Sequence, residues 1–321
     1  MSITAYEFEK PLIELEQKIQ DKEKAEPRDE AELDQLRLEL ERLQREIYSQ
    51  LNPWQRVQLA RHKERPRSVD FVKALMTEFV EIHGDRAFGD DKSMVCGFAT
   101  FRGRPLSVIC QQKGKDTKDN IERNWGMSHP EGYRKALRVM RMAEKFNLPV
   151  IVFIDTPGAF PGIGAEERGQ AEAIARNIRE MFTVEVPIIC IVIGEGASGG
   201  ALGVGVGDLI LMLENSWYCV ISPEGCAGIL WKTPTMAEAA AQQLKLTPPD
   251  LVELGVADEI IPEPAGGAHR NPQAAFENVG TVLERRLAPL CEMDKQQLLD
   301  RRYNKYRYMG RFIDTSDAEE A

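Results

Sequence analysis

Histidine and paired cysteine are scarce in this chain. The four histidines stand far apart, and none of the six cysteines belongs to a Cys-x-x-Cys pair. Zinc sites and the disulfide frameworks of small secreted proteins are built from such clusters. We therefore expect no metal site, and we interpret the cysteines as small buried residues of a protein in a reducing compartment.

Long apolar runs and an excess of basic residues are also missing. No apolar stretch approaches the roughly 20 residues that cross a bilayer, and the first ten residues lack the basic and apolar regions of a targeting peptide. The formal net charge of −10 argues against nucleic acid or an anionic membrane as a partner. We expect an intracellular, soluble protein with neither partner.

The chain begins with a charged, glycine-poor stretch, residues 1–52. Apolar residues recur at a 3-4-3-4 spacing from Leu33 to Ile47, and a similar spacing runs from Leu12 to Ile19 before a break at Glu26-Pro27. This period is typical of amphipathic helices, so we predict a helical hairpin that serves assembly. Such a hairpin packs either on its own domain or on a partner subunit, and the sequence favours neither.

Residues 53–313 form a larger predicted unit. Asn52 suits an N-cap and Pro53 the first position of a helix. Helices are expected over residues 53–60, 71–83, 131–146 and 166–182 and from 272 onward; strands are expected over 95–101, 105–111, 149–154, 187–193, 209–213, 218–222 and 259–261. Apolar strands that alternate with helices indicate an α/β sheet covered on both faces. We expect the acidic segment 314–321 to be disordered.

Two glycine-rich segments, 155–164 and 194–201, each follow a predicted buried strand. Gly194, Gly196 and Gly199 spell the Gly-x-Gly-x-x-Gly of dinucleotide-binding proteins. That motif needs a helix of about ten residues or more before the next strand, whereas only the glycine-rich residues 200–207 are available. We therefore reject the dinucleotide interpretation. The phosphate-binding Gly-x-x-x-x-Gly-Lys-Ser/Thr loop is absent as well.

The segment Ser198-Gly199-Gly200-Ala201 suits a different chemistry. Backbone N–H groups at the start of a short helix can stabilise a developing oxyanion, and glycine lets a ligand approach them closely. We interpret the segment as lacking the Gly-x-Ser-x-Gly pattern of a nucleophile elbow, which makes Ser198 a weak candidate nucleophile. The four histidines form no recognisable triad either. The segment therefore predicts backbone electrostatics without a side-chain acid or base.

Distinctive motifs occur along nearly the whole chain, as far as Tyr306. They are Gln111-Gln112-Lys113-Gly114-Lys115, Asn124-Trp125-Gly126-Met127, His129-Pro130-Glu131-Gly132-Tyr133, Asp155-Thr156-Pro157-Gly158-Ala159, Gly164-Ala165-Glu166-Glu167-Arg168, the Ser198 segment, Ser222-Pro223-Glu224-Gly225-Cys226 and Gly266-Gly267-Ala268-His269-Arg270. Together they resemble the carboxyltransferase alpha subunits of bacterial and plastid acetyl-CoA carboxylases. Two departures are slight: Ala197 stands where many members have glycine, and Phe160 where many have tyrosine.

This resemblance implies an α/β fold of the crotonase type, built from repeated strand-strand-helix units. It also implies a two-alpha, two-beta heterotetramer whose beta subunit carries a zinc ribbon and the acyl-CoA enolate site. The implied reaction transfers the carboxyl group of carboxybiotin to acetyl-CoA and forms malonyl-CoA, the first committed step of fatty acid synthesis.

The other implied components are a biotin carboxyl carrier protein and a biotin carboxylase. This chain has no Met-Lys-Met biotinylation site, so the resemblance implies no covalently bound cofactor and biotin that arrives on another chain. The implied location is the bacterial cytoplasm, or the plastid stroma for a plastid-encoded chain.

The resemblance also implies roles for individual residues. In this family the N–H groups of a Gly-Gly pair, here Gly199 and Gly200, stabilise the oxyanion on biotin as the carboxyl group leaves. The freed biotin nitrogen then takes the methyl proton of acetyl-CoA, so the protein needs no base of its own. The residues that we expect around the substrate are Gly158, Ala159, Phe160, Pro161, Gly162, Ser198 and Ala201.

Two alternatives stay open. The basic cluster of Lys113, Lys115, Lys118 and Arg123 is predicted to contact CoA phosphates or the carrier protein, but a solvated charged surface fits the same pattern. An acyl-CoA hydratase or isomerase of the same superfamily would use carboxylates, for which Glu166 and Glu167 are the candidates.

Overall fold

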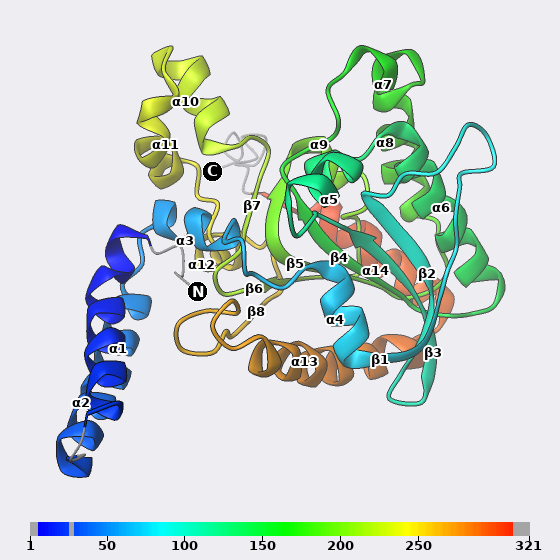
Figure 1. The fold of residues 1–321 in the computed structure, drawn as a ribbon. Helices are drawn as coiled ribbons and strands as arrows, with labels where there is room; N and C mark the ends of the chain where they lie inside the picture. Colours follow the sequence, from blue (N-terminus) through cyan, green and yellow to red (C-terminus); the bar gives the residue numbers. More distant parts are fainter. Residues whose placement is uncertain (1–5, 26–28, 311–321) are drawn as a thin grey trace, which may run out of the picture.

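One eight-stranded sheet organises the described part of the chain (Figure 1). The computed structural model describes residues 6–25 and 29–310. The break predicted at Glu26-Pro27 and the disordered segment predicted over 314–321 lie outside these residues. The strands are β1 (Met76–Glu81), β2 (Met94–Phe101), β3 (Arg104–Gln111), β4 (Val150–Thr156), β5 (Ile188–Ala197), β6 (Leu209–Leu213), β7 (Trp217–Cys219) and β8 (Glu259–Ile261).

The sheet has an antiparallel edge and a parallel remainder. Its order is β1-β2-β3-β4-β5-β6-β8, with β1, β2 and β3 antiparallel and the later neighbours parallel. The short strand β7 pairs with the last residues of β5, from Glu195 opposite Trp217 to Ala197 opposite Cys219. The carboxyl ends of parallel strands share one edge of the sheet, which is where open α/β sheets bind ligands.

Helices cover both faces of the sheet. They are α1 (Lys10–Glu23), α2 (Glu30–Ser49), α3 (Pro53–Ala60), α4 (Ser68–Leu75), α5 (Thr117–Glu122), α6 (Pro130–Lys145), α7 (Ile163–Glu167), α8 (Gln170–Met181), α9 (Ser198–Leu202), α10 (Pro223–Trp231), α11 (Ala237–Gln243), α12 (Pro248–Glu253), α13 (Pro272–Glu292) and α14 (Lys295–Arg307), with 3-10 turns η1 (Glu7–Glu9), η2 (Asn124–Gly126) and η3 (Pro234–Met236). The α/β class predicted from the sequence is confirmed.

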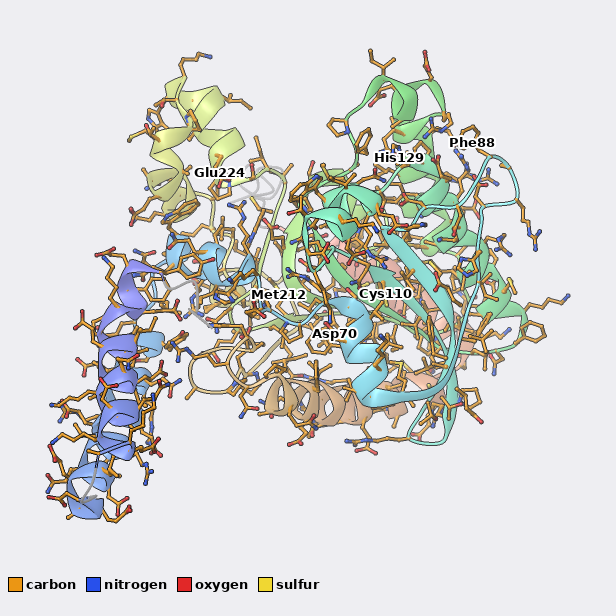
Figure 2. All side chains as sticks on the ribbon, viewed as in Figure 1. Asp70, Phe88, Cys110, His129, Met212 and Glu224 are labelled. Atoms are coloured by element: carbon orange, nitrogen blue, oxygen red, sulfur yellow. The ribbon has the colours of Figure 1, made fainter. Side chains whose placement is uncertain are left out.

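Strand β4 shows how the two faces are built. All of its residues are buried. Ile151 and Phe153 belong to the hydrophobic cluster beneath α4 and α13, whereas Val152 and Ile154 belong to the cluster beneath α6 and α8. Successive side chains of a strand point to opposite faces, so a continuous apolar run is required where both faces are covered. Figure 2 shows Cys110 and Met212, two of these buried residues, in the middle of the sheet.

Several local predictions are confirmed. The Asn52 side chain accepts a hydrogen bond from the Gln55 N–H (2.8 Å) at the start of α3, and Pro53 occupies the first turn. Strands β2 and β3 are joined by Arg102-Gly103, with φ values of +48° and +80°. Two consecutive positive φ angles are the geometry of a tight hairpin turn whose twist matches that of the strands.

The helix predicted over residues 71–83 is wrong in its second half. Helix α4 ends at Leu75, and residues 76–81 form β1 against β2. Thr77, Phe79 and Val80 favour strands, and the free edge of β2 supplies hydrogen-bond partners for this segment. The spacing of apolar residues along the chain does not reveal those partners. Glu78, at φ +55°, lies where the register of this pair shifts.

Three other boundaries also differ from the prediction. The helix expected over 166–182 is divided into α7 and α8 at Gly169, whose φ of +81° is incompatible with a helix interior. The strand expected over 187–193 continues to Ala197, because β7 and β4 supply partners for its last residues. The strand expected over 218–222 is β7, which ends at Cys219.

The N-terminal helical hairpin is confirmed as α1 and α2, which project from the body of the molecule (Figure 1). Ile19, Leu33 and Leu36 pack together within the hairpin itself. Near its base, Leu12 packs with Leu59 of α3. The hairpin thus has its own small core and is attached to its own chain at one end.

Candidate active site

The segment Ser198-Gly199-Gly200 forms the turn between β5 and α9. Ser198 lies at φ +56° and is exposed, Gly199 is half-buried and Gly200 is buried. Because α9 has only five residues, it cannot be the long helix of a dinucleotide-binding motif, and our rejection of that interpretation is confirmed. The first N–H groups of a helix have no acceptor within the helix. The N–H groups of Gly199 and Gly200 are therefore available to an acceptor outside it.

Gly200 joins the two glycine segments. A Cβ atom on Gly200 would lie 2.3 Å from the carbonyl carbon of Gly158, which belongs to the segment after β4. The Gly200 carbonyl accepts hydrogen bonds from Gln111 Nε2 (2.7 Å) and from the Tyr133 hydroxyl (3.3 Å). Backbone thus packs on backbone at this point, and only glycine allows it.

A cavity of about 450 Å³ opens beside this turn. One wall is formed by residues 157–161, and the opposite wall by residues 220–222; Ser198 and Gly199 lie between them. Ile174 and Gln170 of α8 complete the lining, together with Glu166 of α7. A second, apolar cavity of about 350 Å³ adjoins the same turn and shares Ser198, Gly199 and Val220 with the first.

Most of the predicted substrate and oxyanion residues meet at this cavity, but three do not. Gly200 is buried against the backbone of Gly158 and does not line the cavity. Gly158, Ala159, Phe160, Pro161, Ser198 and Gly199 line it. Ala201 is fully buried in the core beneath α6 and α8. Its side chain, which we expected beside the substrate, therefore does not reach the cavity. Gly162 instead packs against the ring of Phe160, where a Cβ atom would lie 2.4 Å from Cε1.

The first cavity wall is held by polar contacts. Gln170 Nε2 donates hydrogen bonds to the carbonyl groups of Ser128 (2.8 Å) and Phe160 (3.0 Å). The ring of His129 lies on that of Phe160, with centroids 4.2 Å apart, and its Nδ1 faces the Arg168 guanidinium at 3.3 Å. Figure 2 labels His129 above the sheet near α7 and α8. The His129 imidazole therefore packs against a residue that lines the cavity.

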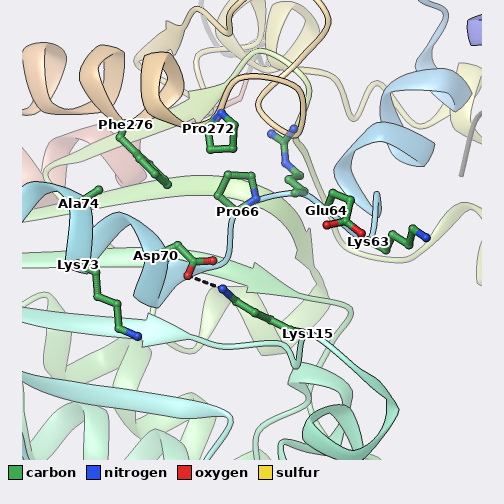
Figure 3. A pocket seen from close by; sticks show the side chains of 10 residues that line it. Lys63, Glu64, Pro66, Asp70, Lys73, Ala74, Lys115, Pro272 and Phe276 are labelled. Atoms are coloured by element: carbon green, nitrogen blue, oxygen red, sulfur yellow. Dashed lines mark hydrogen bonds and ion pairs between the residues drawn. The ribbon is translucent and has the colours of Figure 1, made fainter. Parts of the chain in front are cut away.

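The three predicted lysines are not gathered in one site. Lys113 is buried, and its Nζ lies 2.6 Å from both Asp155 Oδ1 and Glu195 Oε2. Lys115 is exposed and pairs with Asp70 (2.7 Å) at a different cavity, between α4 and the start of α13 (Figure 3). Lys118 is exposed on α5. Lys113 is therefore enclosed between two carboxylates that it already pairs with.

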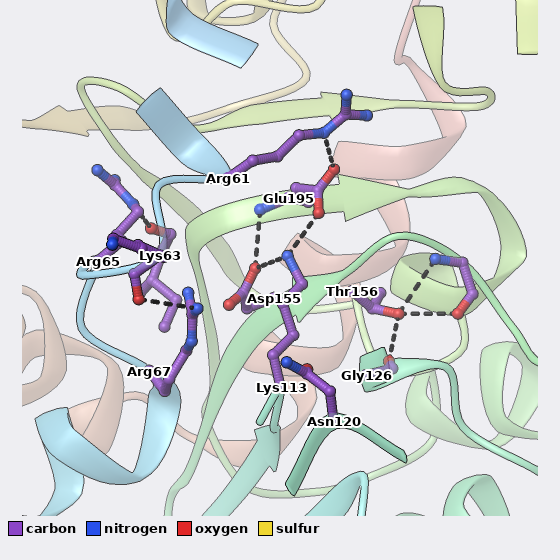
Figure 4. A network of polar contacts seen from close by, with 12 residues as sticks. Arg61, Lys63, Arg65, Arg67, Lys113, Asn120, Gly126, Asp155, Thr156 and Glu195 are labelled. Carbon is purple, nitrogen blue, oxygen red and sulfur yellow. Dashed lines mark hydrogen bonds and ion pairs between the residues drawn. The ribbon is translucent and has the colours of Figure 1, made fainter. Parts of the chain in front are cut away.

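A chain of buried ion pairs was missed in the sequence (Figure 4). Asp155 and Glu195 lie at the carboxyl ends of β4 and β5 with Lys113 between them, and Arg61 Nε contacts Glu195 Oε1 at 2.6 Å. Burial opposes ionisation of Glu195, but Lys113 and Arg61 outweigh it and hold the pKa of Glu195 at about 2. Charged residues inside apolar strands need partners, and that signal is present at both Asp155 and Glu195.

Residues 196–200 are Gly-Ala-Ser-Gly-Gly, so our interpretation that the segment lacks the Gly-x-Ser-x-Gly pattern is wrong. The structure places Ser198 on a strand-to-helix turn at positive φ, which is the backbone of a nucleophile elbow. A nucleophile also needs a base beside it. His129, the imidazole stacked on the cavity residue Phe160, faces Arg168 instead.

Residues 6–25 and 29–310 contain neither a candidate metal centre nor a candidate membrane span. No group of three or more His, Cys, Asp or Glu side chains in them is arranged to hold a metal ion. Likewise, no helix in this part of the chain combines the length and hydropathy of a membrane span.

Comparison with known proteins decides the family. The profile of the family described as acetyl co-enzyme A carboxylase carboxyltransferase-like matches residues 5–310. The chain belongs to this family. It is 54% identical over 319 residues to the acetyl-coenzyme A carboxylase carboxyl transferase subunit alpha of Halalkalibacterium halodurans, and the alignment covers 98% of both chains. It is 56% identical over 308 residues to the corresponding subunit of Bacillus cytotoxicus, and that alignment covers 95% of both chains.

Solved structures agree on the fold. The chain is similar to transcarboxylase 12S with a TM-score of 0.57 at 19% identity, over 70% of this chain and 42% of that one. It is also similar to a chain of a Pseudomonas malonate decarboxylase hetero-tetramer, with a TM-score of 0.56 at 18% identity, over 68% of this chain and 89% of that one. The crotonase-type fold expected from the sequence is confirmed, and the family identifies the chain as a carboxyltransferase subunit.

Proposed function

We propose that this chain supplies the biotin side of an acetyl-CoA carboxylase carboxyltransferase. In this role it takes the carboxyl group of carboxybiotin, delivered on a carrier protein, and passes it to acetyl-CoA to form malonyl-CoA. The observation that carries the proposal is the turn at Ser198–Gly200. It combines the first N–H groups of a helix, which have no acceptor within that helix, with a glycine that has no side chain and an adjoining cavity of about 450 Å³.

The proposed chemistry is electrostatic. Negative charge develops on the ureido oxygen of biotin as its carboxyl group departs. The N–H groups of Gly199 and Gly200 stabilise that charge, and one such donor contributes about 3 kcal/mol. Gly199 lines the cavity and has no side chain, which leaves room for the bicyclic ring of biotin. The atom nearest to a Cβ at this position would be Ile174 Cδ1, at 3.6 Å. Gly158, Ala159, Phe160 and Pro161 form the facing wall.

The acyl-CoA side of the site requires a partner. Large apolar side chains are exposed on the segment that contains the projecting helix α10: Val220 (76%), Ile229 (62%), Leu230 (62%), Trp231 (40%) and Met236 (40%). Leu202 of α9 is 39% exposed and lines the apolar cavity together with Val220. Apolar patches of this kind usually mark protein interfaces. We propose that they meet a zinc-ribbon beta subunit in a two-alpha, two-beta assembly, with the biotin carboxyl carrier protein charged by a biotin carboxylase.

The remaining parts of the chain fit this organisation. Residues 53–313 are the proposed carboxyltransferase domain, and residues 1–52 are a proposed assembly region. Support for the latter is the projection of α1 and α2 from the body (Figure 1). The bacterial relatives support a location in the bacterial cytoplasm.

A Gly199→Val variant tests the oxyanion role. The new side chain enters the cavity without meeting backbone, since the atoms nearest to its Cβ belong to the Ile174 side chain. In complex with the beta subunit, malonyl-CoA formation from the carboxylated carrier should fall by roughly 100-fold or more. Gly89→Val is the control, because a Cβ at Gly89 has no neighbour within 4 Å.

A Gly199→Val complex that assembles and retains the wild-type rate would refute the proposal. Turnover of an enoyl-CoA by this chain alone, abolished by Glu166→Gln, would instead establish the hydratase alternative, since Glu166 lines the cavity.

A further inference from the structure

Arg61 connects the two sides of the cavity. This residue caps the carboxyl end of α3. Its Nε donates to Glu195 Oε1 (2.6 Å), while its Nη1 and Nη2 donate to the two carboxylate oxygens of Glu224 (2.5 and 3.2 Å). The Arg61 side chain is 30% exposed. One guanidinium therefore contacts two carboxylates that are 29 positions apart in the chain.

Glu195 is the fixed partner in this arrangement. Its second carboxylate oxygen accepts from Lys113 Nζ (2.6 Å), and its backbone N–H donates to Asp155 Oδ1 (3.0 Å). Gly194 makes room for that contact, since a Cβ atom there would lie 2.5 Å from Asp155 Oδ1. Figure 4 shows this network at the strand ends. Three residues later the chain reaches Ser198, so the Arg61–Glu195 pair lies at the base of the oxyanion turn.

Glu224 is the partner on the opposite wall. It stands in the first turn of α10, on the projecting helix in Figure 2, directly after the cavity-lining residues 220–222. Those residues lie beyond the end of β7 at Cys219, and Val220 is 76% exposed. The Ser222 cap is local to the start of α10, whereas the ion pair with Arg61 connects the first turn of α10 to the end of α3.

Helix α3 is itself seated on the same structure. Val57 and Ala60 pack with Ala197 of β5, Trp217 of β7 and Ala241 of α11. Arg61 follows Ala60 directly, so its backbone is fixed by apolar packing while its guanidinium reaches both walls. A planar guanidinium can hold two carboxylates in fixed directions, which a lysine ammonium does not do.

We infer that Arg61 is a positioning residue for the biotin side of the reaction. It sets the distance between the oxyanion turn and the wall formed by residues 220–222. This inference rests on the proposed function. Displacing a binding wall by about 1 Å can reduce a rate by roughly 100-fold. Loss of Arg61 therefore impairs the use of the carboxylated carrier and leaves the acyl-CoA side, on the partner, unaffected.

The test compares Arg61→Gln, Arg61→Lys and Glu224→Gln in the complete complex with the beta subunit. Arg141→Gln is a matched control: Arg141 is 34% exposed and also contacts two carboxylates, those of Glu144 and Glu180, but it lies on α6. We expect Arg61→Gln to lower kcat/KM for the carboxylated carrier by roughly 10- to 100-fold with KM for acetyl-CoA unchanged. Arg61→Lys and Glu224→Gln should show smaller losses of the same kind.

Hydrogen exchange in the full-length chain gives a readout that does not depend on activity. Arg61→Gln should accelerate amide exchange in both 195–200 and 220–226, whereas Glu224→Gln should accelerate it in 220–226 alone. Equal losses in Arg61→Gln and Arg141→Gln, a parallel rise in KM for both substrates, or unchanged exchange in either segment would overturn the inference. A wild-type complex that transfers no carboxyl group from biotin would instead refute the proposed function, whatever the exchange pattern.

Discussion

Gly200 and Gly158 approach so closely that a Cβ on the first would lie 2.3 Å from the carbonyl carbon of the second. They belong to the turns after the neighbouring strands β5 and β4. The two glycine segments, separated by some 40 positions in the sequence, therefore form one structure. At Gly199, the preceding residue, a Cβ would contact only the Ile174 side chain, at 3.6 Å. This difference separates a structural glycine from the one proposed to face the substrate.

The first prediction follows from that difference. Gly200→Ala should destabilise the chain by about 1–3 kcal/mol, because backbone must move to admit the methyl group. Gly199→Ala should leave the free energy of unfolding nearly unchanged, since its Cβ meets only the Ile174 side chain at 3.6 Å. Urea unfolding of both variants measures this. Equal stability of the two variants would contradict the close approach of the loops.

The second prediction concerns the buried lysine. Lys113→Met leaves Asp155 and Glu195 facing each other without their shared cation, and breaking a buried pair in this way costs about 3–5 kcal/mol. Lys115→Met removes an exposed pair with Asp70, which contributes about 0–1 kcal/mol. The comparison of the two unfolding curves is the measurement, and a Lys113→Met chain as stable as Lys115→Met would contradict it.

The third prediction concerns acid and the attachment of the N-terminal hairpin. Burial opposes ionisation of Glu9, but the His269 imidazole at 3.5 Å and hydrogen bonds from the Tyr48 hydroxyl and the Tyr6 N–H outweigh it and lower the pKa of Glu9 to about 2. A carboxyl group whose pKa is lowered on folding stabilises the folded state above its unfolded pKa, near 4.5, and loses that contribution as the pH falls. Stability should therefore decline between pH 4.5 and 2 through this group.

Glu9→Gln is the variant that isolates this contribution. Its stability should be lower than that of the wild type near neutral pH and should converge toward it as the pH falls to 2. Chemical unfolding at a series of pH values gives both curves. Parallel curves across this range would mean that Glu9 does not contribute.

The fourth prediction tests the proposed partner surface. Leu230→Asp places a charge on the exposed apolar side of α10 and should abolish co-purification with the beta subunit while leaving the isolated chain folded. Phe146→Asp is the control, because Phe146 is equally exposed, at 62%, but lies at the end of α6. If Leu230→Asp assembles as well as Phe146→Asp, the partner does not cover α10.

Much of the fold was predictable because its signals are local. The apolar spacing from Leu33 to Ile47, the Asn52 cap and the apolar run of β4 depend on residues close together in the chain, and each produced the expected element. The glycine turn at Ser198 could be located in the same way. The errors at residues 76–81 and 194–197 arose where pairing with a neighbouring strand overrode the local pattern.

The sequence by itself thus determined the class of fold, the family and the position of the glycine turn. Only the tertiary structure decided which charged residues belong to the site. Arg61 meets Glu195 and Glu224 across 134 and 163 positions, and Lys113 is enclosed by carboxylates at the carboxyl ends of two different strands. Ion pairs of this kind form only when the sheet brings distant strand ends to one edge, so no spacing along the chain announces them.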